Sequence, residues 1–150
     1  MLDNVCNFIK KGGLMSSPID GQCLCKKVQY KLHAEPKAVG CCYCKSCQIK
    51  SGSDHIVYLA FEHDAVTLEG EIKWYTSIGD SGLLKQHGFC PECGANLFAK
   101  PEHWSHLLIV YAGSLIDSSN YAPKTNLCVK DAPKWSCMNE SLISFEGNPG

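Results

Sequence analysis

Eleven cysteines are spread unevenly along this chain of 150 residues, and most of them fall into three close-set groups. Two thiolates that are one or two residues apart can converge on one metal ion, with each sulfur about 2.3 Å from it. Gly94 follows the last group and permits the tight turn that points backbone N–H groups at a thiolate. The three groups are Cys23 with Cys25, then Cys42 with Cys44 and Cys47, then Cys90 with Cys93.

Counting ligands divides these seven cysteines between two sites. The first and third groups together supply four thiolates, which close a structural zinc site. The middle group supplies three, and a zinc ion with three protein ligands keeps one position open for water or a substrate. A second arrangement joins the middle group to Cys90 or Cys93, but it leaves the first pair without a partner. A third makes every group structural. Metal binding is common to all three arrangements, and the first assigns Cys42, Cys44 and Cys47 to an open, reactive site.

Four cysteines lie outside this count, and Cys41 is the one beside a predicted ligand. If residues 38–42 form a strand, the side chains of Cys41 and Cys42 point to opposite faces. Only one of them can then reach the ion that Cys44 binds, and the C-x-C spacing favours Cys42. We therefore predict that Cys41 is a small core residue. The other cysteines outside the groups are expected to be free thiols: Cys6, Cys128 and Cys137.

The composition indicates one globular domain in a reducing compartment. Hydrophobic residues make up 45% of the chain, which is enough for a core. The net charge is −1 and no long basic run occurs, so nucleic acid is not an expected partner. The N-terminal 21 residues lack the apolar segment of a secretory signal, and no stretch is apolar enough to span a membrane. We expect a cytoplasmic protein whose close-set cysteines bind metal instead of forming disulfides.

The elements that must position these cysteines are predicted to be β-strands. Apolar and polar residues alternate or β-branched and aromatic residues cluster in several short segments, and no segment shows a long helical period. Residues 69–71 are predicted to turn a hairpin between two of these strands. Residues 1–20 are expected to be a flexible extension, and the chain after residue 113 is expected to be irregular, with one short helical turn. The predicted strands span residues 28–33, 55–61, 65–68, 72–76, 83–89, 95–99 and 106–111.

These motifs resemble the glutathione-dependent formaldehyde-activating family, which includes centromere protein V. The resemblance covers about residues 21–136 and leaves residues 137–150 as a C-terminal tail. Three ordered cysteine motifs at matching spacing are specific for the family and less specific for one reaction within it. The matching segments are residues 21–25, 42–48 with 51–52, 89–94 with 97–98, 113–115 and 130–135.

The resemblance implies a β-tent fold of twisted antiparallel sheets with zinc knuckles. It also implies two zinc ions per chain, a structural one on Cys23, Cys25, Cys90 and Cys93 and a labile catalytic one on the middle triple. The implied activity is that of a carbon–sulfur lyase or synthase, in which glutathione and formaldehyde condense to S-hydroxymethylglutathione. The expected partners are therefore a small-molecule thiol and an aldehyde.

Other side chains could assist such a reaction. Lysines could attract the carboxylates of glutathione, a histidine could donate a proton or complete the coordination, and tryptophans could wall a pocket. A non-catalytic zinc-binding interaction module of the same fold is the alternative, and a redox or metal-buffering protein is a third hypothesis. The candidates are Lys26, Lys45, Lys50, His55, His87, Trp104 and Trp135.

Overall fold

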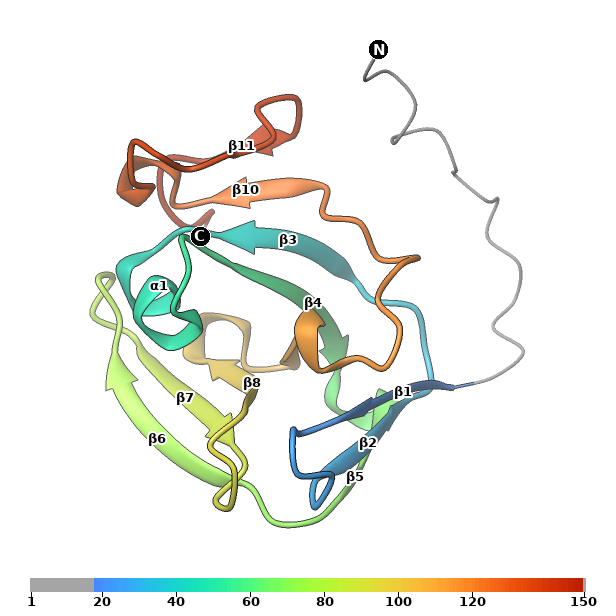
Figure 1. The fold of residues 1–150 in the computed structure, drawn as a ribbon. Helices are drawn as coiled ribbons and strands as arrows, with labels where there is room; N and C mark the ends of the chain where they lie inside the picture. The colour runs from blue at the N-terminus through green and yellow to red at the C-terminus, as the bar shows by residue number, and fades with distance from the viewer. Residues whose placement is uncertain (1–17, 150) are drawn as a thin grey trace.

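Eleven strands and one short α-helix make up residues 18–149, which are the residues that the computed structural model describes (Figure 1). The helix is α1 (Lys45–Ser51), and four 3₁₀ turns lie at His63–Ala65, Glu102–Trp104, Ala112–Ser114 and Val129–Asp131. The strands are β1 (Ile19–Gln22), β2 (Gln29–Leu32), β3 (Ala38–Cys42), β4 (Ile56–Glu62), β5 (Val66–Glu69), β6 (Lys73–Ile78), β7 (Leu84–Phe89), β8 (Asn96–Pro101), β9 (Leu107–Tyr111), β10 (Thr125–Leu127) and β11 (Ile143–Ser144).

A small antiparallel sheet has the strand order β1-β2-β5. Gly21 of β1 lies opposite Tyr30 of β2 in this sheet. A Cβ atom at position 21 would lie 2.0 Å from the Tyr30 ring, so only glycine can occupy this position without displacing the ring. The Tyr30 hydroxyl hydrogen-bonds to Ser114 Oγ at 2.5 Å and thereby ties the small sheet to the turn that follows β9.

The large sheet has eight strands in the order β11-β10-β3-β4-β9-β8-β7-β6. Most of its pairs are antiparallel, but β10 runs parallel to both β3 and β11. In Figure 1 the sheet curves from β11 at the top, through β3 and β4, to β6 and β7 at the lower left, and α1 lies inside this curve. An Asn96 side chain from β8 donates to the Lys50 carbonyl at 2.8 Å and fixes the helix against the sheet.

The central strand β4 is buried on both faces and separates two hydrophobic cores. Leu59 and Phe61 pack into the core that also holds the small sheet, whereas Tyr58 and Ala60 pack into the core on the other face. This alternation follows from the two-residue period of a strand. Both faces of β4 are apolar because both are covered, which is why its sequence is a nearly continuous hydrophobic run.

The prediction of a mainly β fold is confirmed, and three details of the strand prediction are corrected. The predicted hairpin at residues 69–71 is wrong, because β5 pairs with β2 in the small sheet while β6 pairs with β7 in the large one. Gly70 makes this crossing with φ +98, and a Cβ there would lie 2.2 Å from the Lys27 carbonyl oxygen. The sequence also did not indicate α1, nor the strands β10 and β11 beyond residue 113.

The two ends of the predicted domain are placed as follows. Strand β1 begins at Ile19, inside the segment 1–20 that was expected to be an extension, and residues 1–17 lie outside the described residues. The segment 137–150 contributes β11 to the large sheet. Phe145 of this segment packs against the second core, and the Gly147 carbonyl accepts from the Cys128 N–H at 3.2 Å.

Among residues 18–149, no helix has the length and hydrophobicity that crossing a membrane requires.

Candidate metal centres

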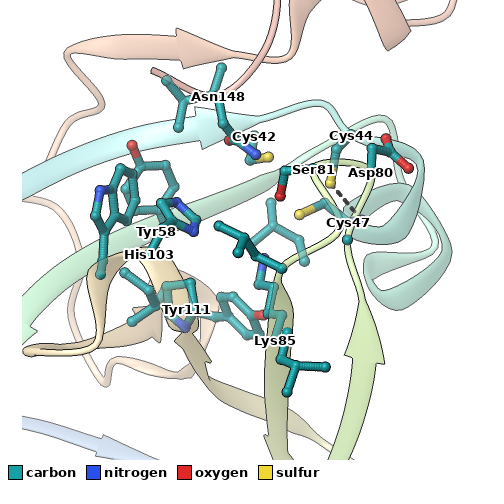
Figure 2. A pocket seen from close by; sticks show the side chains of 18 residues that line it. Cys42, Cys44, Cys47, Tyr58, Asp80, Ser81, Lys85, His103, Tyr111 and Asn148 are labelled. Atoms are coloured by element: carbon teal, nitrogen blue, oxygen red, sulfur yellow. Dashed lines mark hydrogen bonds between the residues drawn. The ribbon is translucent and has the colours of Figure 1, made fainter. Parts of the chain in front are cut away.

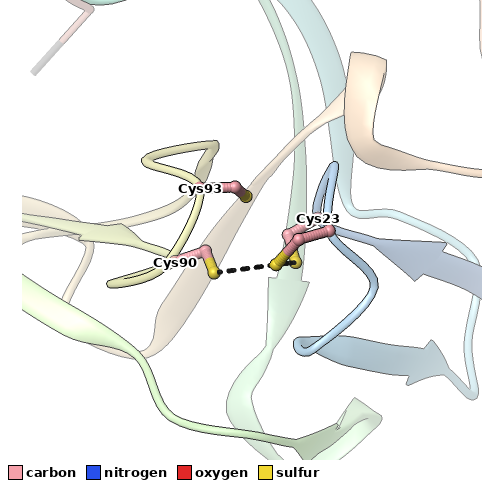
Figure 3. Close-up of side chains that lie close together, drawn as sticks. Cys23, Cys90 and Cys93 are labelled. Carbon is pink, nitrogen blue, oxygen red and sulfur yellow. Dashed lines mark hydrogen bonds between the residues drawn. The ribbon is translucent and has the colours of Figure 1, made fainter.

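Four cysteines meet where two turns, one from each sheet, face each other (Figure 3). The turn between β1 and β2 carries Cys23 and Cys25, and the turn between β7 and β8 carries Cys90 and Cys93. In the second turn the N–H of Gly94 donates to the Cys90 carbonyl at 2.9 Å, and Gly94 adopts φ +73. Such a turn brings both thiols to one side of the chain.

Backbone N–H groups already point at these sulfurs. The Val28 N–H donates to Cys23 Sγ at 3.3 Å. The backbone N–H of Ala95 lowers the pKa of Cys93 to about 6. Hydrogen bonds of this kind stabilise a thiolate, which is the form that binds a metal ion.

The spacing of the four sulfurs fits one tetrahedral ion. Sulfurs at about 2.3 Å from a common zinc ion lie about 3.8 Å from one another. The Cys23 and Cys25 sulfurs are 3.5 Å apart, the Cys25 and Cys90 sulfurs are 3.7 Å apart, and all four lie within 4.8 Å of one another. The cluster can therefore hold a metal ion without rearrangement of the two turns.

The middle triple forms a second cluster at the junction of β3 and α1. Cys42 ends β3, Cys44 is the N-cap of α1, and Cys47 lies in its first turn. Cys44 Sγ accepts from the Cys47 N–H at 3.4 Å, and the three sulfurs lie within 4.8 Å of one another. The helix closes at Gly52, whose left-handed φ of +68 lets its N–H reach the Gln48 carbonyl. This second cluster can also hold a metal ion, and it supplies three ligands.

Cys41 lies on the opposite face of β3 from Cys42, as the strand alternation predicted. It pairs with Val57 in the antiparallel ladder, it is buried, and it belongs to neither cysteine cluster. Burial raises the pKa of the Cys41 thiol to about 11, so this thiol stays protonated. The structure therefore separates two adjacent cysteines into one core residue and one member of the triple.

The three thiols of the triple share negative charge unequally. Hydrogen bonds from Cys42 and Cys47 lower the pKa of Cys44 far below its ordinary value. The Cys42 thiol, which neighbours Cys128 and Cys44, has a raised pKa, and so does Cys47, which donates to the others. The positive charge of Lys85 helps to lower the pKa of Cys44 and partly opposes the rise in the pKa of Cys47. The cluster is thus prepared to bear anionic sulfur.

The triple lines one wall of a cavity with about 690 Å³ of empty space, part of it continuous with solvent (Figure 2). Figure 2 shows Cys42, Cys44 and Cys47 on one side and Tyr58 with His103 on the other. Ile56, Ile109 and Leu127 make much of the surface between them apolar. A small molecule in this cavity can approach the three sulfurs directly. The four-cysteine cluster lines no part of it.

The lysine and histidine candidates have different environments. Lys26 and Lys45 are exposed and are not among the residues that line this cavity. Lys50 is half-buried and donates to His87 and to the Tyr111 hydroxyl. The ring of His55 hydrogen-bonds to Asp54 at 2.6 Å, and His55 belongs to neither cysteine cluster. Both ring nitrogens of His87 have protein partners, so it is not free to complete the coordination.

The cavity wall also contains residues that sequence reasoning did not identify. Trp104 lines the cavity as expected, but Trp135 is 70% exposed and lies outside it. Lys85 lines the cavity and was missed, although strand alternation places it on the same face as His87. Cys128 was expected to be a free thiol, and it is buried in the same core as Cys42.

Comparison with known proteins shows the family of this chain. The family model described as glutathione-dependent formaldehyde-activating enzyme matches residues 18–131. A protein of Schizosaccharomyces pombe, described as an uncharacterized lyase, is 23% identical over 114 residues, which cover 76% of this chain and 80% of that protein. A crystal structure of a Rhodobacter sphaeroides protein shares the fold, with a TM-score of 0.53 at 17% identity over 65% of this chain and 88% of that one. The chain therefore belongs to the glutathione-dependent formaldehyde-activating enzyme family.

Proposed function

We propose that each chain binds two zinc ions with different roles. Cys23, Cys25, Cys90 and Cys93 hold the structural ion, because four thiolates leave no position for a substrate. The middle triple holds the catalytic ion, because three thiolates leave one position open. The donor chemistry supports zinc, since sets of soft thiolate ligands at tetrahedral spacing are typical of it.

We propose that the chain is a carbon–sulfur lyase of the S-(hydroxymethyl)glutathione synthase type. The observation that carries this proposal is the convergence of three cysteine sulfurs on the wall of one cavity. The cavity is lined by apolar side chains together with the three sulfurs and Lys85, which is the mixture of surfaces that small-molecule sites present. The substrates are a small thiol, glutathione, and formaldehyde or a related aldehyde, and the reverse reaction is lysis of the adduct.

The residues of the chain bind and orient the two substrates. Cys42, Cys44 and Cys47 would hold the zinc ion, and the bound ion would supply an open coordination position that lowers the pKa of a substrate thiol. The apolar wall from Ile56, Ile109 and Leu127 limits water around the reacting carbon. Lys85 offers a positive charge to the carboxylates of glutathione from the same cavity. Holding thiol and aldehyde together in this cavity supplies the proximity that accelerates the addition.

We also propose that the protein works in the cytoplasm. Seven cysteines lie in two clusters whose geometry fits a metal ion. This supports a reducing compartment, in which thiolates remain available to zinc.

A panel of thiols and aldehydes tests this reaction. We expect the zinc-loaded protein to accelerate adduct formation from glutathione and formaldehyde, and Cys44→Ser to lose this acceleration. Cys44 is chosen because it caps α1 and its sulfur accepts from the Cys47 N–H, so its loss removes one ligand and opens the cluster. The assay follows formaldehyde consumption above the uncatalysed rate for each thiol. Full activity in Cys44→Ser, or no acceleration by wild type with any pair, contradicts the proposal.

A further inference from the structure

A continuous series of side-chain hydrogen bonds begins at Tyr111 on the cavity wall. It links four elements, which are three strands of the large sheet and helix α1. Ser77 Oγ of β6 lies 2.7 Å from His87 Nε2 of β7, and His87 Nδ1 lies 2.7 Å from Lys50 Nζ of α1. Lys50 Nζ in turn donates to the Tyr111 hydroxyl of β9. His87 and Tyr111 are 5% and 7% exposed, respectively, so water competes little for these contacts.

The direction of each hydrogen bond in this chain is fixed by Lys50. An ammonium group can only donate, so His87 Nδ1 accepts and Nε2 carries the single proton of a neutral imidazole. His87 therefore donates to Ser77. Burial lowers the pKa of His87 to about 4, with the charges of Lys50 and Lys85 acting in the same direction, so the ring is neutral at pH 7.

Because Lys50 donates to the Tyr111 oxygen, the Tyr111 O–H is available to donate to another group. The Tyr111 oxygen accepts from Lys50, so its own O–H is directed elsewhere. Among the described residues, no acceptor for this O–H is recorded, and Tyr111 lines the cavity together with the triple (Figure 2). Burial raises the pKa of Tyr111, so its hydroxyl is protonated at neutral pH. Tyr111 is thus a protonated donor at the edge of the thiol cavity.

We propose that Tyr111 donates its proton to the aldehyde oxygen, and that Lys50, held by His87 and Ser77, positions the hydroxyl and restores the proton. The inference rests on the proposed function, because it needs a thiolate and an aldehyde in this cavity. Tyr111 is a catalytic residue in this scheme, and Lys50 and His87 are positioning residues.

The step balances in atoms and charge. The substrate thiolate sulfur bonds to the carbonyl carbon, and the π pair of the C=O bond moves to oxygen. That oxygen takes the Tyr111 proton, and the Lys50 ammonium returns a proton to the phenolate. The proton that the substrate thiol lost on binding replaces the one that Lys50 gave. The net reaction joins RSH and CH₂O to RS–CH₂OH, and lysis follows the same steps in reverse.

The test compares Tyr111→Phe with Tyr30→Phe. Each variant removes one buried hydroxyl, but Tyr30 lines no part of the thiol cavity. Its hydroxyl reaches Tyr111 only through Ser114, which donates to the Tyr111 backbone carbonyl and not to the phenol. We expect Tyr111→Phe to lower kcat for glutathione and formaldehyde by about 100-fold, as loss of a general acid does, with unchanged zinc content and unchanged KM for glutathione. Tyr30→Phe should keep the wild-type kcat. Lys50→Met should lower kcat in the same direction, whereas Lys50→Arg, which keeps the cation, should recover part of it.

A binding measurement gives a readout that does not depend on turnover. S-formylglutathione carries an oxygen on the carbon next to sulfur, and S-methylglutathione does not. By calorimetry, wild type should bind the formyl conjugate roughly three- to tenfold more tightly than the methyl conjugate, the effect of one hydrogen bond. Tyr111→Phe should bind both equally.

The possible outcomes separate the two proposals. An active wild type with a Tyr111→Phe variant that keeps kcat and the formyl preference overturns the role of Tyr111 and leaves the proposed function standing. A wild type that neither turns over nor binds either conjugate overturns the proposed function, and the role of Tyr111 falls with it.

Discussion

Cys42→Ser is expected to abolish adduct formation while Cys41→Ser, one residue earlier, leaves it intact. Cys42 belongs to the triple on the cavity wall, whereas Cys41 points to the other face of β3. A serine hydroxyl stays protonated at neutral pH and does not replace a thiolate ligand. We expect kcat/KM to fall roughly 1,000-fold or more in Cys42→Ser, which corresponds to about 4 kcal/mol of transition-state stabilisation.

Cys41→Ser is the matched control because both cysteines are buried and lie on one strand. Its zinc content and kcat/KM should stay within a factor of two of wild type, and its free energy of unfolding should fall by about 1 kcal/mol. Zinc content is measured by elemental analysis of the purified variants, and unfolding by urea titration. If Cys41→Ser and Cys42→Ser lose zinc and activity equally, the assignment of Cys42 to the metal site and of Cys41 to the opposite face of β3 is wrong.

Cys90→Ser is expected to have the largest effect on stability. Cys90 is fully buried and lies 3.7 Å from the Cys25 sulfur, so it joins the turn of one sheet to the turn of the other. Binding of a structural zinc ion contributes directly to folding in small domains, with apparent values of about 10–16 kcal/mol in zinc-finger peptides. We expect loss of one ligand to lower the free energy of unfolding by about 3–5 kcal/mol and Tm by roughly 10–20 °C.

Cys137→Ser is the control for this second prediction. Cys137 is exposed and belongs to neither cluster, so its Tm should match wild type within about 1 °C. Thermal unfolding is followed by circular dichroism with zinc in slight excess. If Cys90→Ser has the same Tm as Cys137→Ser and wild type, the four-cysteine cluster does not stabilise the fold.

The ligand groups could be predicted from the sequence because their spacing is local. Cysteines that have one or two residues between them can converge on one point whatever the rest of the chain does. The structure brings the sulfurs together in the two groups that the ligand count predicted, one of four cysteines and one of three. The position of Cys41 could also be predicted, since it needed only the two-residue period of a strand. The strands of the middle of the chain followed from the same short-range patterns.

The missed elements were too short or too dependent on distant partners. Helix α1 has seven residues, so it shows too little of a helical period to be recognised, and β10 and β11 have three and two. The hairpin at residues 69–71 was wrong because a turn signal does not say which strand the next one pairs with. The pairing of β5 with β2, and of β6 with β7, depends on how the two sheets pack and bury their side chains in the folded protein.

The hydrogen-bonded series of side chains that links Ser77 to Tyr111 could not be predicted from the sequence, because it depends on contacts between distant elements. Its members come from β6, β7, α1 and β9, and no short-range pattern connects them. Lys50 was expected to attract substrate carboxylates, as an outward-facing lysine would. The structure turns it inward, onto His87 and Tyr111, while Lys85 supplies the positive charge at the cavity.

Zinc stoichiometry and its loss under mild chelation test the central claim most directly. The measurement is native mass spectrometry before and after brief exposure to a chelator, with circular dichroism and activity on the same samples. We predict two zinc ions per chain, of which one leaves quickly, with the fold retained and the activity lost until zinc is restored. A single tightly held ion, or two ions that leave together as the protein unfolds, would contradict the division into a closed and an open site and would favour a non-catalytic module.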